Sequence, residues 1–429
     1  MNDQPSHPKP VDENHSTLKL MIVAGEASGE KHGAALARAL KRLYPATDFE
    51  MFGSGGEEMR AAGVETFVDV RDIGIIGIAE VLRAFGRIYG AYRKLLEAAR
   101  LRQPAAIVLI DFPDFNMALA RRLRREGFKV IYYISPQVWA WRSHRTKALS
   151  RDVKRMLVIL PFEEEFYREA GVEVEYVGHP LVEEVKITAS REEFIAKHNL
   201  NSEKPIIALL PGSRRKEIHY HLPAMIDAAA RLTRMNFELP DEQMVPTTSL
   251  QNFKSSVSNL KSHISDVQFV LPLASTIDRR QVEAILEQSR FTNEIDLTLI
   301  ERDTYNALGH SLFAIVASGT ATVETALAGT PMVIIYQAST LNHAIMRPLI
   351  EIETFGMVNL IAGRRIVPEL IQFDVTGEKI ANEMALILSD PSRYSKMKQD
   401  IAEVRARLES ADGPGADKAA HAVMDIAFQ

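Results

Sequence analysis

Short apolar runs alternate with amphipathic segments along almost the whole chain. In the first half, the apolar runs predict strands at 18–24, 106–110, 130–134 and 156–160, with helices at 32–43 and 117–126. A second series predicts strands at 206–210, 268–272, 297–300, 313–317 and 332–336. Near-continuous apolar strands between helices are typical of a parallel sheet covered on both faces. The pattern therefore predicts an α/β protein with two doubly wound, Rossmann-like domains facing a cleft.

Breaks in this alternation suggest where the domains end. Residues 1–16 are polar and are predicted to form a disordered tail. We place an N-terminal domain at 17–185 and a C-terminal domain at 200–375, because the polar stretch 181–204 between them is typical of a linker. Residues 376–429 follow as helices that cross back to the first domain. Residues 236–265, rich in Ser, Thr, Asn and Gln, are interpreted as a surface insertion.

Composition narrows the function classes. The net charge of the 429 residues is −5, so we expect no nucleic-acid partner. The absence of cysteine excludes a disulfide framework, thiolate metal sites and a cysteine nucleophile, and it suits the cytoplasm. No run approaches the roughly 20 apolar residues that span a bilayer, so membrane contact is predicted to be peripheral.

Two motifs of the first half lie directly after predicted strands, where doubly wound sheets bind ligands. Gly25–Glu30 (GEASGE) allows a tight turn and close approach of a ligand, although a turn without a ligand is equally compatible. Asp111 ends the strand at 106–110, where its carboxylate could act as a general base on a sugar hydroxyl. The alternative role for an acid in this motif is a helix N-cap, which suits Asp114 better than Asp111.

Both tryptophans of the chain lie within residues 135–142. If this segment is extended, Trp139 and Trp141 lie on one side of it. Tryptophan beside arginine suits a sugar ring or a lipid interface, and packing in the core is the alternative. The basic residues that follow, up to Arg155, form either a solvated face or a surface for phosphate or anionic lipid.

Two turns of the second half suit a diphosphate. Gly212-Ser213-Arg214 and Ser318-Gly319-Thr320 each follow an apolar strand and enter a predicted helix. Helix N-terminal amides and an arginine bind phosphate well. Glu324, one and a half turns into its helix, could accept hydrogen bonds from two ribose hydroxyls. Alternatively, it is an ordinary acid near a helix N-terminus, where the helix dipole stabilises its charge.

Several absences limit the chemistry. The sequence has no P-loop pattern, which argues against an NTPase, and no Asp-x-Asp, the usual carboxylate site for a metal-bound nucleotide-sugar. The histidines form no ligand-spaced cluster. His219 and His221 are two apart on a predicted helix and diverge, so we interpret them as surface or packing residues. We therefore predict catalysis without a metal ion.

Six motifs taken together resemble the lipid-A-disaccharide synthases. AGEASGE, IDFPDFN, SPQVWAWR, LPGSR, ASGTATVE and MVNLIAGR occur in that family's order and approximate spacing. The resemblance implies the two-domain GT-B glycosyltransferase fold. It implies transfer of 2,3-diacylglucosamine from its UDP donor to 2,3-diacylglucosamine 1-phosphate, giving a β-1,6-linked disaccharide phosphate and UDP. It also implies that the protein lies peripherally on the cytoplasmic face of the inner membrane and that it needs no cofactor. A homodimer is possible.

The resemblance also assigns roles to residues. Asp111 matches the general base, Arg214 an arginine needed for activity, and Glu324 the ribose-binding acid of GT-B enzymes. Asn359 matches a functional asparagine near the nucleotide. Without a metal ion, the diphosphate charge would be met by Arg214 and by the amides at Ser213 and 318–320.

The acceptor side is implied in the same way. Glu26, Ser28 and Gly29 lie in the glycine-rich loop that faces the acceptor in this family. Glu30 stands where many members have aspartate, so its part in the site stays open. The 236–265 insertion is longer than expected.

Three other functions remain compatible with the motifs. A UDP-N-acetylglucosamine 2-epimerase and the peptidoglycan N-acetylglucosaminyltransferase share the fold and the UDP-sugar. A non-enzymatic module that binds a nucleotide-sugar or a lipid would use the same turns without turnover.

The segment 73–78 is the candidate membrane contact. It is almost wholly isoleucine and glycine, and it leads into a predicted helix at 79–100 with one apolar face and several basic residues. Packing of that face on the sheet is the alternative for the helix as a whole. We predict that Ile75 and Ile76 meet lipid, with the nearby basic residues favouring anionic headgroups.

Overall fold

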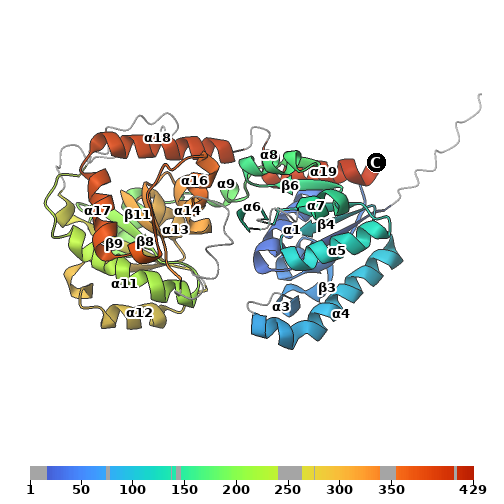
Figure 1. Ribbon diagram of the computed structural model, residues 1–429, viewed down its shortest axis with the longest axis horizontal. Coiled ribbons are helices and arrows are strands. Elements are labelled where there is room, and N and C mark those ends of the chain that lie inside the picture. Colours follow the sequence, from blue (N-terminus) through green and yellow to red (C-terminus); the bar gives the residue numbers. More distant parts are fainter. Residues whose placement is uncertain are drawn as a thin grey trace, which may run out of the picture. The chain divides into compact units, whose positions relative to one another are not determined.

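A computed structural model describes residues 17–73, 78–136, 138–141, 146–239, 263–274, 276–338, 354–409 and 413–429. Contacts divide the chain into two compact units, each built on one sheet (Figure 1). Unit 1 takes in residues 1–138, 142–178 and 410–429, and unit 2 takes in residues 139–141 and 179–409. The tail at 1–16 and most of the insertion, 240–262, lie outside the described residues.

The sheet of unit 1 has seven parallel strands in the order β3-β2-β1-β4-β5-β6-β7. They are β1 Leu18–Ala24, β2 Phe49–Gly55, β3 Glu65–Asp69, β4 Ala106–Ile110, β5 Val130–Tyr133, β6 Arg155–Val158 and β7 Val174–Tyr176. The central strands are apolar throughout because helices cover both of their faces.

Alternate residues of the strands enter two separate apolar clusters, one on each face of the sheet. On one face lie α1 Ala27–Leu43, α2 Glu57–Ala61 and α19 Gly415–Phe428. On the other lie α4 Ile78–Arg102, α5 Pro113–Arg125, α7 Thr146–Asp152 and α8 Pro161–Glu169. The short helix α3 Val70–Ile73 also belongs to unit 1, whereas α6 Val138–Trp141 has three of its four residues in unit 2. The C-terminal helix α19 thus returns to pack on α1.

The sheet of unit 2 has six parallel strands in the order β10-β9-β8-β11-β12-β13. They are β8 Ile206–Leu210, β9 Gln268–Leu273, β10 Leu297–Glu301, β11 Phe313–Ala317, β12 Met332–Tyr336 and β13 Glu369–Ile371. One group of helices packs around α11 Arg215–Leu232, namely α12 Arg279–Gln288 and α17 Gly377–Leu388. A second group packs around α14 Thr320–Leu327, namely α9 Leu181–Glu184, α13 Thr304–Gly309, α16 Met357–Ala362 and α18 Pro391–Leu408.

These two sheets confirm the predicted fold class. Five of the predicted strands have the expected bounds, and four strands, β2, β3, β7 and β13, were not predicted. β2 contains two glycines and shifts register against β3, and β7 and β13 have three residues each with one acidic residue. None of the four therefore presents a continuous apolar run. The domain boundaries at 185, 200 and 375 stay a prediction.

The segment interpreted as a linker is folded. Residues 191–198 form α10, Arg191–His198, which begins with a capping box between Ser190 and Glu193. Phe194 of this helix is fully buried, and its ring contacts those of His198 and His310. The polar composition of this stretch reflects a capped surface helix of unit 2 rather than a connection without packing.

The strand order reverses once in each sheet. In unit 1 the reversal lies between β1 and β4, and in unit 2 between β8 and β11. Ligands of doubly wound sheets bind outside the carboxyl ends of the strands at such reversals. Four of the predicted motifs follow these four strands directly, so the topology places them at the expected ligand positions.

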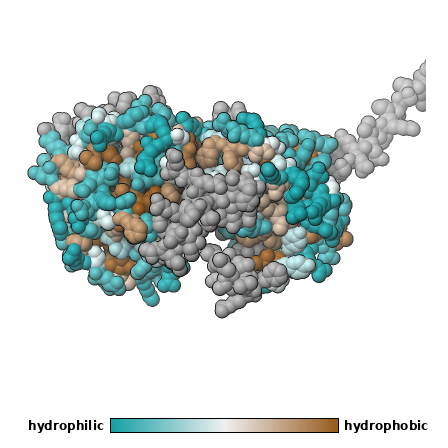
Figure 2. Space-filling model, in the orientation of Figure 1, coloured by the Kyte–Doolittle hydropathy of each residue, from teal (hydrophilic) through white to brown (hydrophobic). Residues whose placement is uncertain are grey.

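The described residues include no helix that could span a membrane. Among those residues no helix is both long and apolar enough to cross a bilayer. Figure 2 shows hydrophilic side chains over much of the visible described surface, with apolar side chains scattered among them.

Candidate active site

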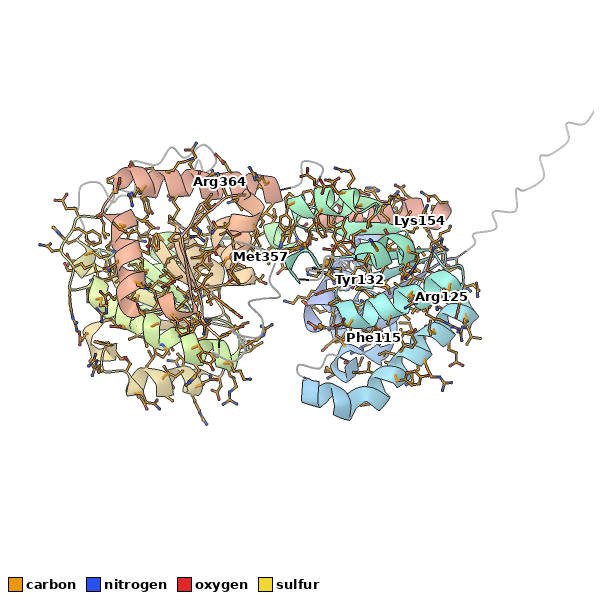
Figure 3. The ribbon with its side chains drawn as sticks, in the orientation of Figure 1. Phe115, Arg125, Tyr132, Lys154, Met357 and Arg364 are labelled. Carbon is orange, nitrogen blue, oxygen red and sulfur yellow. The ribbon has the colours of Figure 1, made fainter. Side chains whose placement is uncertain are left out.

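Asp111 lies at the strand reversal of unit 1 in an unusual backbone conformation. Asp111 and Phe112 have φ angles of +46° and +50°, a region that costs a residue other than glycine about 1 kcal/mol or more. The carbonyl oxygen of Asp111 accepts hydrogen bonds from the Tyr132 hydroxyl at 2.7 Å and from Asn116 Nδ2 at 2.8 Å. Both of these side chains are fully buried, and Figure 3 labels Tyr132 within unit 1. The surrounding core therefore holds the turn that presents the Asp111 carboxylate.

The helix that follows Asp111 does not use an acid as its cap. The N-cap residue of α5 is Phe112, which makes no side-chain cap hydrogen bond, and Asp114 lies exposed in the first turn. The N-cap role considered for Asp114 is therefore wrong, because the left-handed turn starts the helix two residues earlier. Asp111 is left as a carboxylate without a structural task at the helix start.

Burial changes the acidity of Asp111. Desolvation, helped by the nearby negative charge of Glu26, raises the pKa of Asp111 to about 6, against a hydrogen bond from the Phe112 amide that lowers it. At neutral pH such a group is mostly deprotonated, yet it binds a proton more strongly than an ordinary aspartate. This is the balance that a general base requires.

The glycine-rich loop packs directly against the Asp111 turn. A Cβ on Gly25 would lie 2.3 Å from carbons of the Phe112 ring, so only glycine allows this approach. Glu26 occupies the N-cap position of α1, and its side chain and that of Ser28 are exposed. Gly29 is buried against Ile110, with room for a Cβ. The structure thus brings the two first-half motifs together, as the strand order requires.

Glu30 has a structural partner. Its carboxylate accepts a hydrogen bond from the Glu58 amide at 2.8 Å, in the first turn of α2. A Cβ on Gly56, the N-cap residue of α2, would collide with the same carboxylate. Glu30 therefore caps α2, which glutamate can reach because its side chain is longer than that of aspartate.

The tryptophan motif is helical rather than extended. Residues 138–141 form α6, in which residues two apart point in different directions, so the assumption that put both rings on one side is wrong. The Trp139 side chain is buried, and the side chain of Trp141 lies outside the described residues.

Two side chains of α8 anchor the start of this motif. The Ser135 hydroxyl donates to the buried carboxylate of Glu163, and the Tyr167 hydroxyl donates to the Pro136 carbonyl at 2.9 Å. The sequence contains no signal that separates Glu163 from its exposed acidic neighbours in PFEEEF.

In unit 2, the turn after β8 is closed by an acid that sequence reasoning missed. Glu217 Oε2 accepts hydrogen bonds from the amides of Ser213 at 2.9 Å and Arg214 at 3.2 Å. Its other oxygen lies 3.1 Å from Arg214 Nη1, and 73% of the Arg214 side chain is exposed. The Ser213 amide expected to meet phosphate is therefore occupied in this structure. The capping-box spacing from Arg214 to Glu217 was the available signal.

The turn after β11 has the opposite character. Gly319, with φ of +142°, is the N-cap residue of α14 and has no side chain to cap the helix. The first amides of a helix have no partner within it, so this turn presents N–H groups suited to a phosphate. The Ser318 hydroxyl donates to the Phe355 carbonyl at 2.9 Å and fixes the neighbouring loop. Of the two turns, this one is the better phosphate cradle.

Glu324 lies in the second turn of α14 and is partly exposed. The Tyr305 hydroxyl donates to Glu324 Oε1 at 3.4 Å, a long hydrogen bond. Burial raises the pKa of Tyr305, so its hydroxyl remains a neutral donor. This geometry leaves the Glu324 carboxylate oriented and accessible.

Asn359 is buried and uses its whole amide within the protein. Its Nδ2 donates to the Val367 carbonyl at 3.0 Å and to Glu369 Oε1 at 2.6 Å, and its Oδ1 accepts from the amides of Ile366 and Val367. Glu369 also accepts from the amides of Phe355 and Gly356. The structure thus favours a role for Asn359 in holding the loop beside Ser318, rather than in contacting a ligand itself.

Part of the candidate membrane region can be located. Ile75 and Ile76 lie outside the described residues. Farther along α4, Ile88 and Tyr92 pack against the core of unit 1, as the packing alternative proposed, whereas 55% of Tyr89 is exposed.

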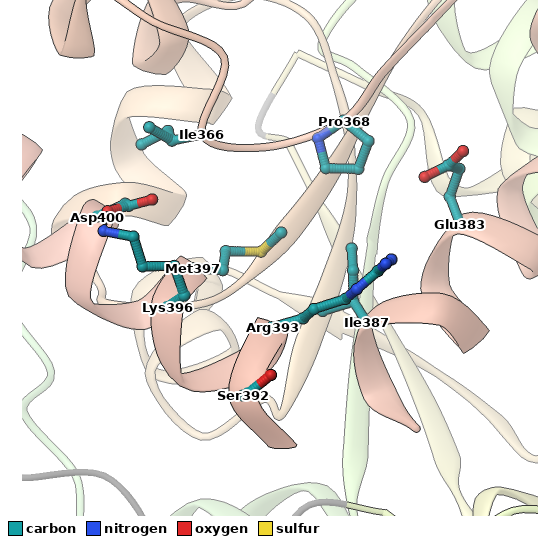
Figure 4. Close-up of a pocket in the computed structure, with 9 residues that line it drawn as sticks. All are labelled: Ile366, Pro368, Glu383, Ile387, Ser392, Arg393, Lys396, Met397 and Asp400. Carbon is teal, nitrogen blue, oxygen red and sulfur yellow. Dashed lines mark hydrogen bonds and ion pairs between the residues drawn. The ribbon is translucent and has the colours of Figure 1, made fainter. Parts of the chain in front are cut away.

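One cavity of unit 2 lies apart from the candidate residues. A cavity of about 400 Å³ between α17 and α18, lined by Glu383, Arg393 and Lys396 among others, contains none of the candidate residues (Figure 4). Within the described ranges, no group of three or more His, Asp or Glu side chains could hold a metal ion.

Comparison with known proteins identifies the family. The sequence matches the lipid-A-disaccharide synthetase family over residues 20–248 and 243–423. It is 43% identical over 412 residues to the lipid-A-disaccharide synthase of Koribacter versatilis, with 96% of this chain and 99% of the relative covered. The chain belongs to the lipid-A-disaccharide synthase family.

Solved structures show the same fold. The UDP-GlcNAc 2-epimerase of Neisseria meningitidis bound to UDP-GlcNAc aligns with a TM-score of 0.56 and 11% identity, covering 91% of this chain and 97% of that one. The glycosyltransferase SnogD of Streptomyces nogalater aligns with a TM-score of 0.52 and 16% identity, covering 96% and 100%. At these identities the likeness concerns the GT-B fold alone.

We predict that Asp111→Asn makes the protein more stable at pH 8. The pKa of Asp111 rises from 3.8 to about 6 on folding, so above pH 6 the buried charge destabilises the folded state. Its removal should gain up to about 3 kcal/mol, at about 1.4 kcal/mol per pKa unit. The gain should vanish below pH 4, where the aspartate is protonated in both states.

Urea unfolding at pH 8, 6 and 4 measures this difference. Asp114→Asn, in the exposed first turn of α5, is the matched control and should change little. Equal stability of Asp111→Asn and wild type at pH 8 would show that Asp111 carries no desolvation cost.

Proposed function

We propose that the protein is a lipid-A-disaccharide synthase. It transfers 2,3-diacylglucosamine from UDP-2,3-diacylglucosamine to 2,3-diacylglucosamine 1-phosphate, and it releases the β-1,6-linked disaccharide 1-phosphate and UDP. Family membership over nearly the whole chain supports the reaction. The observation that carries the mechanism is Asp111, a carboxylate of raised pKa presented by a strained turn at the strand reversal of unit 1.

The proposed reaction is a single displacement with inversion. The acceptor 6-hydroxyl loses its proton to Asp111 while its oxygen bonds to C1 of the donor sugar. The bond from C1 to the UDP oxygen breaks at the same time, and UDP leaves with the electron pair. Because attack comes from the face opposite the leaving group, an α-linked donor gives a β-linked product. As UDP departs, positive charge develops at C1 and is shared with the ring oxygen, which stabilises this oxocarbenium-like transition state.

Unit 2 supplies the groups that bind UDP in this proposal. The amides of the first turn of α14 and the guanidinium of Arg214 meet the diphosphate, and Glu324 accepts from the ribose hydroxyls. Within the part of the chain that the structure describes, Arg214 is exposed and pairs with Glu217 on its own turn, so a small rotation makes it available. We propose that no metal ion is needed, because the sequence lacks Asp-x-Asp and these groups meet the charge.

The lipid substrates require contact with a membrane. We propose that the protein works on the cytoplasmic face of the inner membrane, and that the segment 73–78 and the start of α4 meet the bilayer. Exposed Tyr89 on α4 supports this placement, since tyrosine favours the membrane interface. A homodimer remains a prediction.

The substrate pair tests the function. Wild-type protein incubated with UDP-2,3-diacylglucosamine and 2,3-diacylglucosamine 1-phosphate should give the disaccharide phosphate by mass spectrometry, with a β-anomeric coupling by NMR. UDP-N-acetylglucosamine alone, or with a polyprenyl-linked muramyl peptide, should give no product.

Asp111→Asn should lower kcat by about 10²–10⁴-fold with UDP affinity kept. A variant with wild-type kcat would remove Asp111 from the chemistry.

Metal dependence is predicted to be absent. Activity should persist in excess EDTA, and Arg214→Ala should raise the KM for the donor and lower kcat, because no ion replaces the guanidinium. Lys216→Ala, an exposed cation two residues away, serves as the control for charge alone. Loss of activity in EDTA with recovery on addition of Mg²⁺ would refute this proposal.

Membrane contact is tested by sedimentation with anionic vesicles. Ile75→Ser/Ile76→Ser should weaken binding by well over tenfold, since each buried CH₂ contributes about 0.8 kcal/mol and the double variant removes several of them. Leu101→Ser, at the other end of α4 and 78% exposed, should bind as wild type does. If the double variant folds and sediments as wild type does, the contact lies elsewhere, with residues 138–142 the next candidates.

A further inference from the structure

A buried histidine joins two loops at the carboxyl edge of the unit 2 sheet. His221, two turns into α11, is 1% exposed. Its Nδ1 lies 2.8 Å from the Pro211 carbonyl oxygen, and its Nε2 lies 3.0 Å from the Gln337 amide nitrogen. Both partners are main-chain groups, and they follow different strands.

The partners define the state of the imidazole. A carbonyl oxygen can only accept a hydrogen bond and an amide can only donate one, so Nδ1 carries the proton and Nε2 is the acceptor. Burial lowers the pKa of His221, which agrees with this neutral form. With both nitrogens engaged and the ring buried, His221 cannot contact a ligand directly.

The two loops lie on either side of the phosphate-binding turn. Pro211 follows β8 and opens the turn Gly212-Ser213-Arg214, and Gln337 follows β12. In the sheet, β11 lies between β8 and β12, so the Ser318–Thr320 turn that ends β11 lies between the two loops that His221 joins. The Ser318 amide also donates to the carbonyl oxygen of Ile335 at 2.8 Å, in the strand β12 that leads into this second loop.

The second loop is held from its other side as well. Ala338 exchanges two hydrogen bonds with the Gln372 side chain, at 3.2 and 2.7 Å. Gln372 is itself buried and has φ of +57°. Gln372 thus holds Ala338, while His221 links the adjacent Gln337 to the turn that carries Arg214.

We propose that His221 is a positioning residue of the UDP-sugar site, which sets the spacing between the Arg214 turn and the α14 phosphate turn. This inference rests on the proposed function, because it assigns those two turns to the diphosphate. His221 acts through main-chain groups, so its loss should weaken UDP binding more than it slows the chemistry at Asp111 in unit 1.

Three substitutions separate the two hydrogen bonds. His221→Asn retains a donor near the Nδ1 position for Pro211, and His221→Gln retains an acceptor near the Nε2 position for Gln337. His221→Leu keeps an apolar side chain and loses both bonds. His219→Leu, exposed on the same helix, is the matched control.

The measurements are the Kd of UDP by calorimetry, the KM and kcat with the two substrates, and Tm. We expect His221→Leu to raise the Kd of UDP and the donor KM by about 10- to 50-fold, the value for two hydrogen bonds. His221→Asn and His221→Gln should each recover part of the lost UDP affinity. In all three variants, kcat should fall by a smaller factor than the KM rises. The control His219→Leu should match wild type. If His221→Leu does not fold, the Asn and Gln variants carry the test.

Folded His221 variants that bind UDP as tightly as wild type, even with a lowered Tm, would overturn the proposal and leave His221 a packing residue. Failure of the proposed function is a separate outcome, since wild type itself would then form no disaccharide, whether or not it binds UDP.

Discussion

The left-handed turn at Asp111 and Phe112 is the constraint on which the candidate site of unit 1 depends. Two consecutive residues other than glycine adopt positive φ there, and the turn persists because Tyr132 and Asn116 both donate to the Asp111 carbonyl from the core. The same turn lays the Phe112 ring over Gly25, which brings the glycine-rich loop and Glu26 toward the carboxylate. Burial and the charge of Glu26 then raise the pKa of Asp111. Backbone strain, packing and acidity are thus parts of one arrangement.

In unit 2, partly or fully buried polar side chains hold the loops at the carboxyl edge of the sheet. Each of these loops is tied to another element by such a side chain. Glu369 holds the loop before α16, Gln372 and His221 hold the loop after β12, and Glu217 caps α11. Buried polar groups that are fully hydrogen-bonded define one arrangement of their surroundings. The two turns that we propose to bind the diphosphate are therefore held in one arrangement by the protein itself.

Much of the fold could be predicted from the sequence because parallel strands buried on both faces have continuous apolar runs, as in β4, β8, β11 and β12. β2, with its glycines and shifted register, and the three-residue edge strands β7 and β13 lack that pattern. The positions of Asp111 and Ser318–Thr320 followed from their place at strand ends.

The partners of these residues could not be predicted in the same way. Tyr132, Glu369 and His221 act through contacts between segments far apart in the chain, and nothing in their local sequence distinguishes them from core or surface residues. Asn359 shows the converse: its motif pointed to the nucleotide, whereas the structure commits its amide to the main chain. Trp139 was misjudged because an extended segment was assumed where a helix forms.

The central claim is that unit 1 presents Asp111 as a base whose proton affinity is raised by burial. A carbon-13 NMR titration of protein labelled at the aspartate carboxyl carbons measures it directly, with the Asp111 signal assigned by its loss in Asp111→Asn. We expect this carboxyl to titrate with a pKa near 6 in the folded protein, and Glu26→Gln to lower that value. A pKa near the ordinary aspartate value of about 3.9 would contradict the account.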